Sequence, residues 1–169
     1  MKVRAAEAHD AGAIAAIYAH YVATSPATFD EAAPGASAFA RKVEGIRSAG
    51  LPFLVADDGG AVAGYAYLTP YRERSAYRHT VENSVYVAPD ARGRGVGRAL
   101  LDRLLGEGQR AGVREVIAVI AATDAAASVA LHRACGFREA GRFEAVGFKH
   151  GAWHDTILMQ RSLRTGAPA

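Results

Sequence analysis

Residues 80–101 read TVENSVYVAPDARGRGVGRALL, and the expected fold class follows from the pattern of these residues. Its first part is rich in β-branched residues and predicts a strand over Arg78–Val87. A glycine-rich loop follows, and from Val96 onward leucines recur at the spacing of one helical face. Val113–Ala121 then predicts another strand. The order strand, loop, helix, strand predicts a βαβ unit at the centre of the chain.

The segments on either side predict further strands and helices. Asp57-Asp58-Gly59-Gly60 indicates a hairpin, because Asp-Gly and Gly-Gly sequences tolerate positive φ. The complete order predicts one α/β domain with a mixed sheet over residues 1–163 and a short tail over 164–169. The other predicted elements are a strand at Val3–Ala5, a helix opened by Asp10, a helix at Ser37–Ser48, strands at Leu51–Ala56 and Val62–Leu68, a helix at Ala125–Ala134, and strands at Arg138–Phe148 and Trp153–Gln160.

The composition predicts a compact globular domain. The chain has 169 residues, of which 50% are hydrophobic and 22% charged, so disorder is a poor interpretation. Its longest apolar run, Val116–Ala122, is far shorter than the roughly 20 residues of a membrane span. A single cysteine, Cys135, allows neither an internal disulfide nor a cysteine-based zinc site. We therefore expect a cytoplasmic protein without a metal and without a membrane segment.

The charge pattern favours a small anion over nucleic acid. The formal net charge is only +3, which is too weak a bias to indicate nucleic acid. However, residues 90–114 hold arginines at 92, 94, 98, 103, 110 and 114 against acids at 90, 102 and 107. This local excess of arginine suits an anionic ligand.

The loop Arg92-Gly93-Arg94-Gly95-Val96-Gly97 is the candidate anion site. Glycines allow close approach to backbone N–H groups, and a helix start adds the positive end of its dipole. Arginines in the loop suit a pyrophosphate that carries a further 3′-phosphate. A Rossmann site would follow the first strand and be uncharged, and a P-loop would require Gly-Lys-Ser/Thr, which is absent. The structural alternative is a flexible surface turn.

This loop resembles the acetyl-CoA motif of the GNAT acetyltransferases, Arg/Gln-x-x-Gly-x-Gly/Ala after a strand. Together with Ala27-Thr28-Phe29, ASVALHRACGF at 127–137 and VGFKHGAWHDTILMQRSL at 146–163, it resembles the phosphinothricin N-acetyltransferase branch from residue 3 to about 163. The resemblance implies an α/β GNAT fold, with a mostly antiparallel sheet and helices on both faces. It also implies acetyl-CoA as co-substrate and a homodimer that uses the C-terminal strands.

Acetyl transfer from a thioester to an amine needs a base, an oxyanion donor and an acid for the thiolate. Glu82 is the candidate base, and a solvent-facing strand carboxylate is the alternative. The resemblance implies a bulge that aims the backbone of Val85 and Val87 at the pantetheine, with the Val87 N–H as oxyanion donor. His132 stands where the family commonly has a tyrosine, so it is a candidate acid or second base; the alternative is a surface histidine.

The resemblance implies cofactor contacts from the loop, the strand before it and the later helix. Asp124 stands where the family often has Asn; Asp can cap the helix but cannot donate to an amide. Cys135 is interpreted as a packing residue, with a nucleophile as the alternative because His132 lies one turn away. The predicted cofactor set is Val85, Tyr86, Val87, Arg92, Gly93, Arg94, Gly95, Val96, Gly97, Arg98, Asp124 and Ser128.

For the acceptor amine, the resemblance implies that the loop before Glu82 and Phe29 enclose a small amino-acid-like substrate. Arg72 and Arg74 are candidates to clamp its carboxylate, and solvated arginines are the alternative. The predicted acceptor set is Phe29, Arg72, Arg74, Glu82, Asn83 and His150.

We therefore predict an acetyl-CoA-dependent N-acetyltransferase for a small amino acid analogue of the phosphinothricin, methionine sulfoximine or methionine sulfone type. One alternative is a GNAT enzyme that acetylates another small amine or a protein N-terminus. The other is a non-catalytic acetyl-CoA-binding module, which the presence of Glu82 disfavours.

Overall fold

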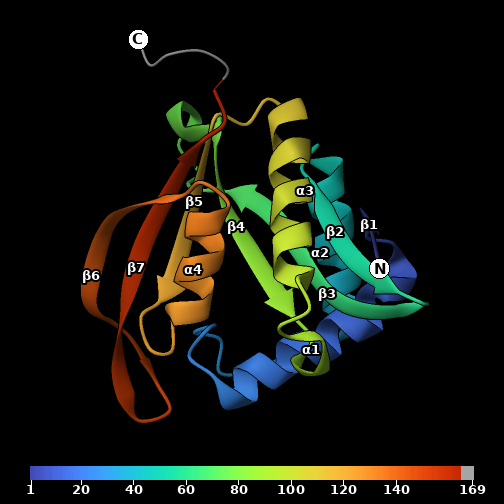
Figure 1. Cartoon of the computed structure of the whole chain (residues 1–169), viewed down its shortest axis with the longest axis horizontal. Coiled ribbons are helices and arrows are strands. Elements are labelled where there is room, and N and C mark those ends of the chain that lie inside the picture. The colour runs from blue at the N-terminus through green and yellow to red at the C-terminus, as the bar shows by residue number, and fades with distance from the viewer. Residues whose placement is uncertain (165–169) are drawn as a thin grey trace.

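The computed structural model describes residues 1–164; of the predicted tail, residues 165–169 lie outside the description. The described chain forms a seven-stranded sheet in the order β1-β2-β3-β4-β5-β7-β6, in which only β4 and β5 are parallel neighbours. The predicted mixed, mostly antiparallel sheet is confirmed (Figure 1). The elements are β1 Lys2–Ala5, α1 Ala11–Thr24, α2 Ala36–Ser48, β2 Phe53–Asp58, β3 Ala61–Pro70, β4 Thr80–Val87, α3 Val96–Arg110, β5 Glu115–Ala121, α4 Ala126–Ala134, β6 Arg138–Lys149 and β7 Ala152–Ser162.

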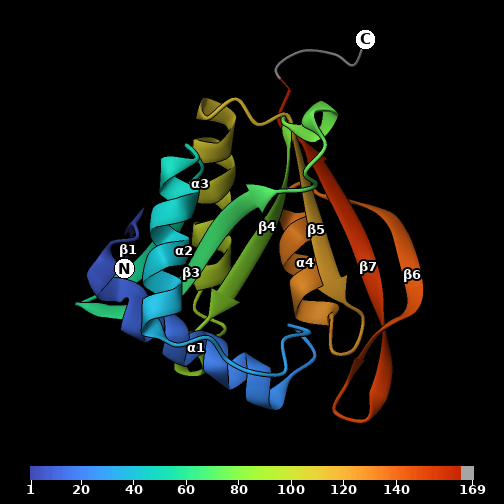
Figure 2. The same cartoon turned by 180° about the vertical axis from the view of Figure 1, so that it is seen from behind.

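The helices cover both faces of the sheet, as predicted. Helices α3 and α4 lie over one face, and α1 and α2 lie over the other (Figures 1 and 2). Helix α3 docks through the apolar stripe foreseen in the sequence, and Leu100, Leu101 and Leu104 are fully buried. None of the helices in residues 1–164 is long and apolar enough to cross a membrane.

An aromatic cluster joins the centre of the sheet to α1 and α2. Tyr65 of β3 lies directly opposite Tyr86 of β4, and their ring centroids are 5.3 Å apart. Tyr18 of α1 meets Tyr86 edge-on at 5.3 Å and Phe39 of α2 at 5.4 Å. These edge-to-face contacts hold α1 against β4 and α2.

Strands β4 and β5 pair over only three residues and then diverge. Their parallel register runs from Thr80 opposite Glu115 to Glu82 opposite Ile117. Beyond this point β5 continues to Ala121 on β7 alone, and β4 continues to Val87 on β3 alone. The sheet therefore opens between its two central strands, just after Glu82 (Figure 1).

Candidate active site

The opening exposes backbone groups of β4 that have lost a strand partner. On the β3 side, Tyr71 N–H donates to the Thr80 carbonyl and Ala88 N–H donates to the Ala63 carbonyl. In an antiparallel ladder such bonded positions alternate, so the N–H and C=O groups of the odd-numbered β4 residues point toward β5. Since β5 has moved away, the backbone groups of Val85 and Val87 face the opening. The cause is not the expected bulge: the β3–β4 register runs without a shift from Val81 to Val87.

A cavity of about 1000 Å³ occupies this opening. Its walls are the end of α1 with the segment after it, β4, the glycine loop with the start of α3, β5, and α4. The sequence-predicted residues that line it are Phe29, Glu82, Asn83, Val85, Tyr86, Val87, Arg92, Gly93, Gly95, Val96, Gly97, Arg98, Asp124, Ser128 and His132.

The glycine loop has the geometry of an anion-binding helix start. Gly93 and Gly95 have φ of 73° and 79°, a conformation that glycine adopts without steric cost, and α3 begins at the next residue. Gly97 permits close packing, because a Cβ there would lie 3.2 Å from Leu131 of α4. Arg92 lies with its guanidinium carbon 5.2 Å from the centre of the Tyr21 ring, at the cavity wall.

Two of the predicted cofactor residues are held differently from what the sequence predicts. Arg94 does not line the cavity: its guanidinium donates to Asp58 of β2 at 2.6 Å, so its charge is already paired. Asp124 lines the cavity but makes no cap for α4, which begins at Ala126 without a side-chain capping bond. Its φ of 57° places it in the left-handed region, which Asp and Asn tolerate better than other non-glycine residues.

Glu82 is a half-buried carboxylate at the point where β4 and β5 part. Its removal from water raises the pKa of Glu82 above its ordinary value. The residue follows the alternation of the strand and shares the sheet face of Tyr86, which α1 covers. A carboxylate with a raised pKa at a cavity wall is suited to accept a proton near neutral pH.

His132 is not a surface histidine, since only 4% of its surface is exposed. Its Nδ1 lies 2.8 Å from the Ser128 carbonyl, an acceptor, so Nδ1 carries the hydrogen. Burial lowers the pKa of His132, and in the resulting neutral ring Nε2 accepts a hydrogen bond from Asn83 Nδ2 at 3.0 Å. In this state the imidazole can take a proton but has none to give at Nε2.

The Asn83–His132 pair leaves one polar atom unsatisfied. With its NH₂ group directed at His132, the Oδ1 of Asn83 is buried and has no hydrogen-bond partner within residues 1–164. Asn83 also lines the cavity. Because an unpartnered buried acceptor is costly, this oxygen is suited to receive a donor from a bound molecule.

Glu82 and His132 approach the cavity from opposite faces of the sheet. Consecutive residues of a strand point to opposite faces, so Glu82 shares the α1 side with Tyr86, and Asn83 faces α4, where it meets His132. The opening therefore has one titratable side chain on each side of the gap between β4 and β5.

Cys135 fits the packing role that the sequence predicts. It is 2% exposed, it is not among the residues that line the cavity, and burial raises the pKa of its thiol to about 11.

Three predicted acceptor residues lie outside the cavity. Arg72 and Arg74 belong to an exposed loop before β4, where Arg72 lies against the ring of Tyr71. His150 has φ of 50° and forms, with Gly151, the two-residue turn between β6 and β7. Its position is explained by this turn.

Sequence reasoning missed several residues in and around the cavity. Lys149, the neighbour of His150, is 1% exposed and bonds to the segment that carries Phe29. His154 of β7 bonds to Thr123 at the cavity wall, and Tyr21 donates to the Val87 carbonyl at 2.7 Å. Alternation along the GFKHG motif at 147–151 predicts that Lys149 and Phe148 point to opposite faces of the strand. The local sequence does not show which of the two faces is buried.

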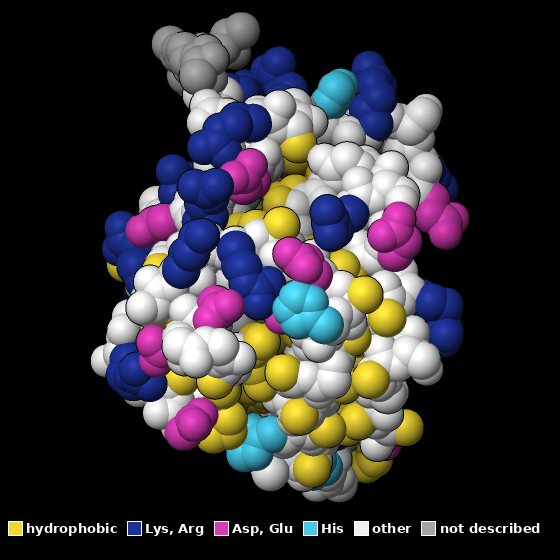
Figure 3. All heavy atoms as spheres, turned by 90° about the vertical axis from the view of Figure 1, so that its right-hand side faces the viewer, with side chains coloured by type: hydrophobic (Ala, Val, Ile, Leu, Met, Phe, Trp, Pro, Cys, Tyr) yellow, Lys and Arg dark blue, Asp and Glu magenta, His cyan; other side chains and the backbone are white. Residues whose placement is uncertain are grey.

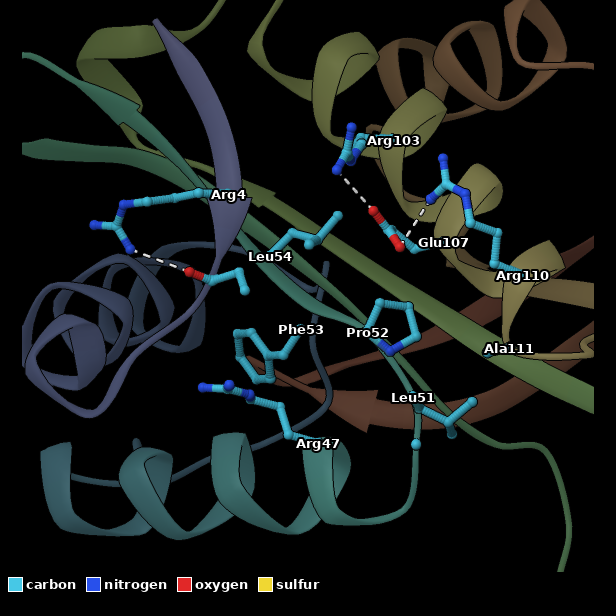
Figure 4. A pocket seen from close by; sticks show the side chains of 12 residues that line it. Arg4, Arg47, Leu51, Pro52, Phe53, Leu54, Arg103, Glu107, Arg110 and Ala111 are labelled. Carbon is cyan, nitrogen blue, oxygen red and sulfur yellow. Dashed lines mark hydrogen bonds and ion pairs between the residues drawn. The ribbon is translucent and has the colours of Figure 1, made fainter.

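A second cavity, of about 460 Å³, lies near the β1 edge, away from Glu82. It contains four arginines, but Arg103 and Arg110 share the carboxylate of Glu107, each at 2.8 Å (Figure 4). Arg4 is paired with Asp10 and Asp57. Figure 3, a view onto this edge, shows basic and acidic side chains interspersed over the face. Most of the positive charge in this cavity is therefore already neutralised.

Comparisons with known proteins show which proteins this chain is similar to. The chain is 49% identical over 164 residues to a phosphinothricin N-acetyltransferase of Alcaligenes faecalis, covering 97% of this chain and 83% of that protein. A crystal structure of a GNAT superfamily phosphinothricin acetyltransferase from Sinorhizobium meliloti in complex with acetyl-CoA has a TM-score of 0.92 and 45% identity, covering 96% of this chain and 88% of that one. An acetyltransferase structure from Salmonella typhimurium with acetyl-CoA has a TM-score of 0.95 and 36% identity, covering 100% of this chain and 97% of that one.

The model of the acetyltransferase (GNAT) family matches residues 14–137, which include the glycine loop, Glu82 and His132. With identity to relatives extending over nearly the whole chain, the resemblance carried by the loop is confirmed. The chain belongs to the GNAT family of acetyltransferases.

Proposed function

We propose that this protein transfers the acetyl group of acetyl-CoA to the amino group of a small amino acid analogue of the phosphinothricin or methionine sulfoximine type. The observation that carries the proposal is the opening between β4 and β5, where Glu82, the backbone of Val87 and the glycine loop border one cavity. The names of the relatives supply the acceptor class: they include phosphinothricin and L-methionine sulfoximine/L-methionine sulfone acetyltransferases.

The cavity residues fit acetyl-CoA. The start of α3 with Gly93 and Gly95 offers N–H groups and dipole to the pyrophosphate, and Arg92 and Arg98 add charge. The β5-facing backbone of Val85 can bond a pantetheine amide in the manner of a missing strand. The co-substrate supplies a thioester, whose carbonyl carbon is activated toward an amine.

The chain's own residues supply the proton transfers and the oxyanion contact. Glu82 accepts the ammonium proton of the acceptor, directly or through one water, because only the neutral amine is nucleophilic. The Val87 N–H donates to the oxygen on which negative charge develops. The carbonyl of the same residue, in the following peptide group, accepts a hydrogen bond from Tyr21, which helps to hold the backbone at Val87. On the other side, the attacking nitrogen loses its second proton as the tetrahedral adduct collapses, and the leaving thiolate takes one up. His132, whose Nε2 can accept a proton, can receive this proton and pass it to the sulfur.

The acceptor pocket lies on the α1 side. Phe29 and the segment before it form its wall. Recognition of a carboxylate by Arg72 or Arg74 remains a prediction, since both lie in the exposed loop. A GNAT enzyme for another amine is the second candidate, and the exposed position of these arginines is what favours it.

We also propose a homodimer and a cytoplasmic location. Strands β6 and β7 expose Phe143, Val146, Phe148 and Trp153, each by more than half of its surface. Phe148 and Trp153 are cross-strand partners with ring centroids 5.1 Å apart, so the apolar surface is contiguous. A second copy of the chain is the proposed cover. The single free cysteine is consistent with a reducing compartment.

The first prediction concerns the glycine loop. Gly95→Val forces a β-branched residue into φ of 79°, which distorts the loop that presents its N–H groups. We expect the dissociation constant of acetyl-CoA to rise at least tenfold, about 1.4 kcal/mol, by calorimetry. Gly112→Val, at φ of 82° beyond the end of α3, is the matched control and should bind normally. Unchanged affinity in folded Gly95→Val would remove the loop from the site.

The second prediction concerns Glu82 as base. Glu82→Gln keeps size and removes basicity, so kcat/KM should fall by roughly 10² to 10⁴ at neutral pH. In the wild type, kcat/KM should fall as pH drops through the raised pKa of Glu82, because protonation blocks the base. The variant should lack this limb. Glu44→Gln, on the exposed side of α2, is the control; if Glu82→Gln matched it in activity, Glu82 would be structural.

The third prediction tests acceptor class. Release of free thiol from acetyl-CoA should be seen with phosphinothricin and methionine sulfone and be weak with a peptide N-terminus. If Arg72 grips the carboxylate, Arg72→Ala should raise KM for these acceptors about tenfold or more, since charge-assisted bonds contribute about 1.5 to 3 kcal/mol each. Arg72→Lys should recover part of the loss. Equal losses of kcat/KM for an amino acid analogue and its decarboxylated amine would contradict the clamp.

The fourth prediction concerns assembly. Light scattering should give a mass of twice the 17.7 kDa chain, because the β6–β7 surface is covered by a second copy. Trp153→Glu places a charge at the centre of this surface and should yield the monomer. Ala61→Glu adds the same charge at an exposed position of β3 and should leave the dimer intact. A monomeric wild type at micromolar concentration would refute the proposal.

A further inference from the structure

Lys149 at the end of β6 is a buried cation that the reaction itself does not use. Its side-chain nitrogen donates to the carbonyl of Ser25 at 2.9 Å and to that of Thr28 at 2.7 Å. The residue is 1% exposed, and a buried ammonium is costly unless its hydrogen bonds are made. Both partners lie more than 120 residues earlier in the chain, so this contact joins two distant segments.

The place of the ammonium explains why a lysine is required. Helix α1 ends at Thr24 with Ser25 as its C-cap, so the ammonium lies at the negative end of the helix dipole. The chain turns directly afterward, and the Ser25 and Thr28 carbonyls converge on one donor. An apolar side chain in this position would leave two carbonyls without that partner.

The bonded segment forms part of the cavity wall. Ser25, Pro26, Ala27, Thr28 and Phe29 all line the cavity that holds Glu82. The hydroxyl of Thr28 bonds to Tyr18 at 2.7 Å, which ties the far side of the segment to α1.

The β6–β7 hairpin holds the same segment by packing. The ring of Phe29 lies so close to Gly147 that a Cβ at position 147 would be 2.3 Å from it. His154 of β7 donates through Nε2 to the Lys149 carbonyl at 3.0 Å and accepts at Nδ1 from Thr123 at 2.8 Å. The Lys149 backbone is thus held through His154 by Thr123 at the cavity wall, while the Lys149 ammonium holds the Ser25–Phe29 segment.

We propose that Lys149 is a positioning residue for the acceptor: by bonding the Ser25 and Thr28 carbonyls, it fixes the Ser25–Phe29 segment and so sets the shape of the acceptor side of the cavity. The inference rests on the proposed function, because it assigns this wall to the acceptor. The acetyl-CoA side, formed by the glycine loop and the start of α3, shares none of these bonds.

The test is Lys149→Met, which keeps the length of the side chain and removes its donors. We expect KM for the acceptor to rise tenfold or more, while the dissociation constant of acetyl-CoA changes less than twofold. Amide hydrogen exchange of residues 25–29 should quicken in the variant and remain unchanged in β5. Lys42→Met is the matched control, because Lys42 also donates a partly buried hydrogen bond, to the Tyr67 hydroxyl at 2.7 Å, but does not contact residues 25–29 through it. This control should change neither the KM for the acceptor nor the hydrogen exchange of residues 25–29.

Unchanged acceptor KM and exchange in Lys149→Met would overturn the proposal, as would an equal loss for acceptor and acetyl-CoA. If Lys149→Met does not fold, Lys149→Gln keeps an uncharged donor and should raise the acceptor KM by a smaller factor; failure of both to fold would assign Lys149 to the core and also overturn the proposal. A wild type inactive on every acceptor would instead refute the proposed function, and the exchange comparison would still test the role of Lys149.

Discussion

Hydrogen bonding between β4 and β5 stops after three residue pairs, and the functional architecture depends on that interruption. A parallel pair normally satisfies the backbone groups on the facing edges of both strands. Here β5 turns away with β7, and β4 stays with β3, so a central sheet edge becomes available inside the molecule. Buried backbone groups need partners, and a ligand with amides can supply them. The opening is thus suited to an extended ligand that carries amides.

At this opening, the titratable side chains lie on the two opposite faces of the sheet. Alternation along β4 sends Glu82 toward α1 and Asn83 toward α4, so one carboxylate and one imidazole meet a ligand from opposite sides. Burial acts on them in opposite directions, because it disfavours the charged form of each. It raises the pKa of Glu82, which makes the ionised carboxylate a stronger base, and it lowers the pKa of His132, which favours the neutral ring. The ionised carboxylate and the neutral imidazole can each accept a proton.

Helix ends organise the two ligand sides. The positive end of α3 lies at the glycine loop, where an anionic group is stabilised. The negative end of α1 is met by the Lys149 ammonium, which holds the segment carrying Phe29. The positive end of α3 is therefore suited to an anionic ligand, whereas the negative end of α1 is already met by the Lys149 ammonium. This difference explains why one helix end serves binding and the other serves the shape of the pocket.

The strands, the helices and the glycine loop could be predicted from the amino-acid sequence, because they depend on local properties. Leucine spacing, β-branched runs and glycines that adopt positive φ act over a few residues, and the predicted strands and helices agree with the structure to within about two residues. Which side chains face the cavity, in contrast, depends on how distant segments pack. Arg94 pairs with Asp58 of a distant strand, His150 lies in a turn, and Lys149 bonds to the Ser25 carbonyl at the end of α1. Those outcomes depend on contacts between segments far apart in the chain, and no local pattern specifies which distant partner will satisfy a given charge.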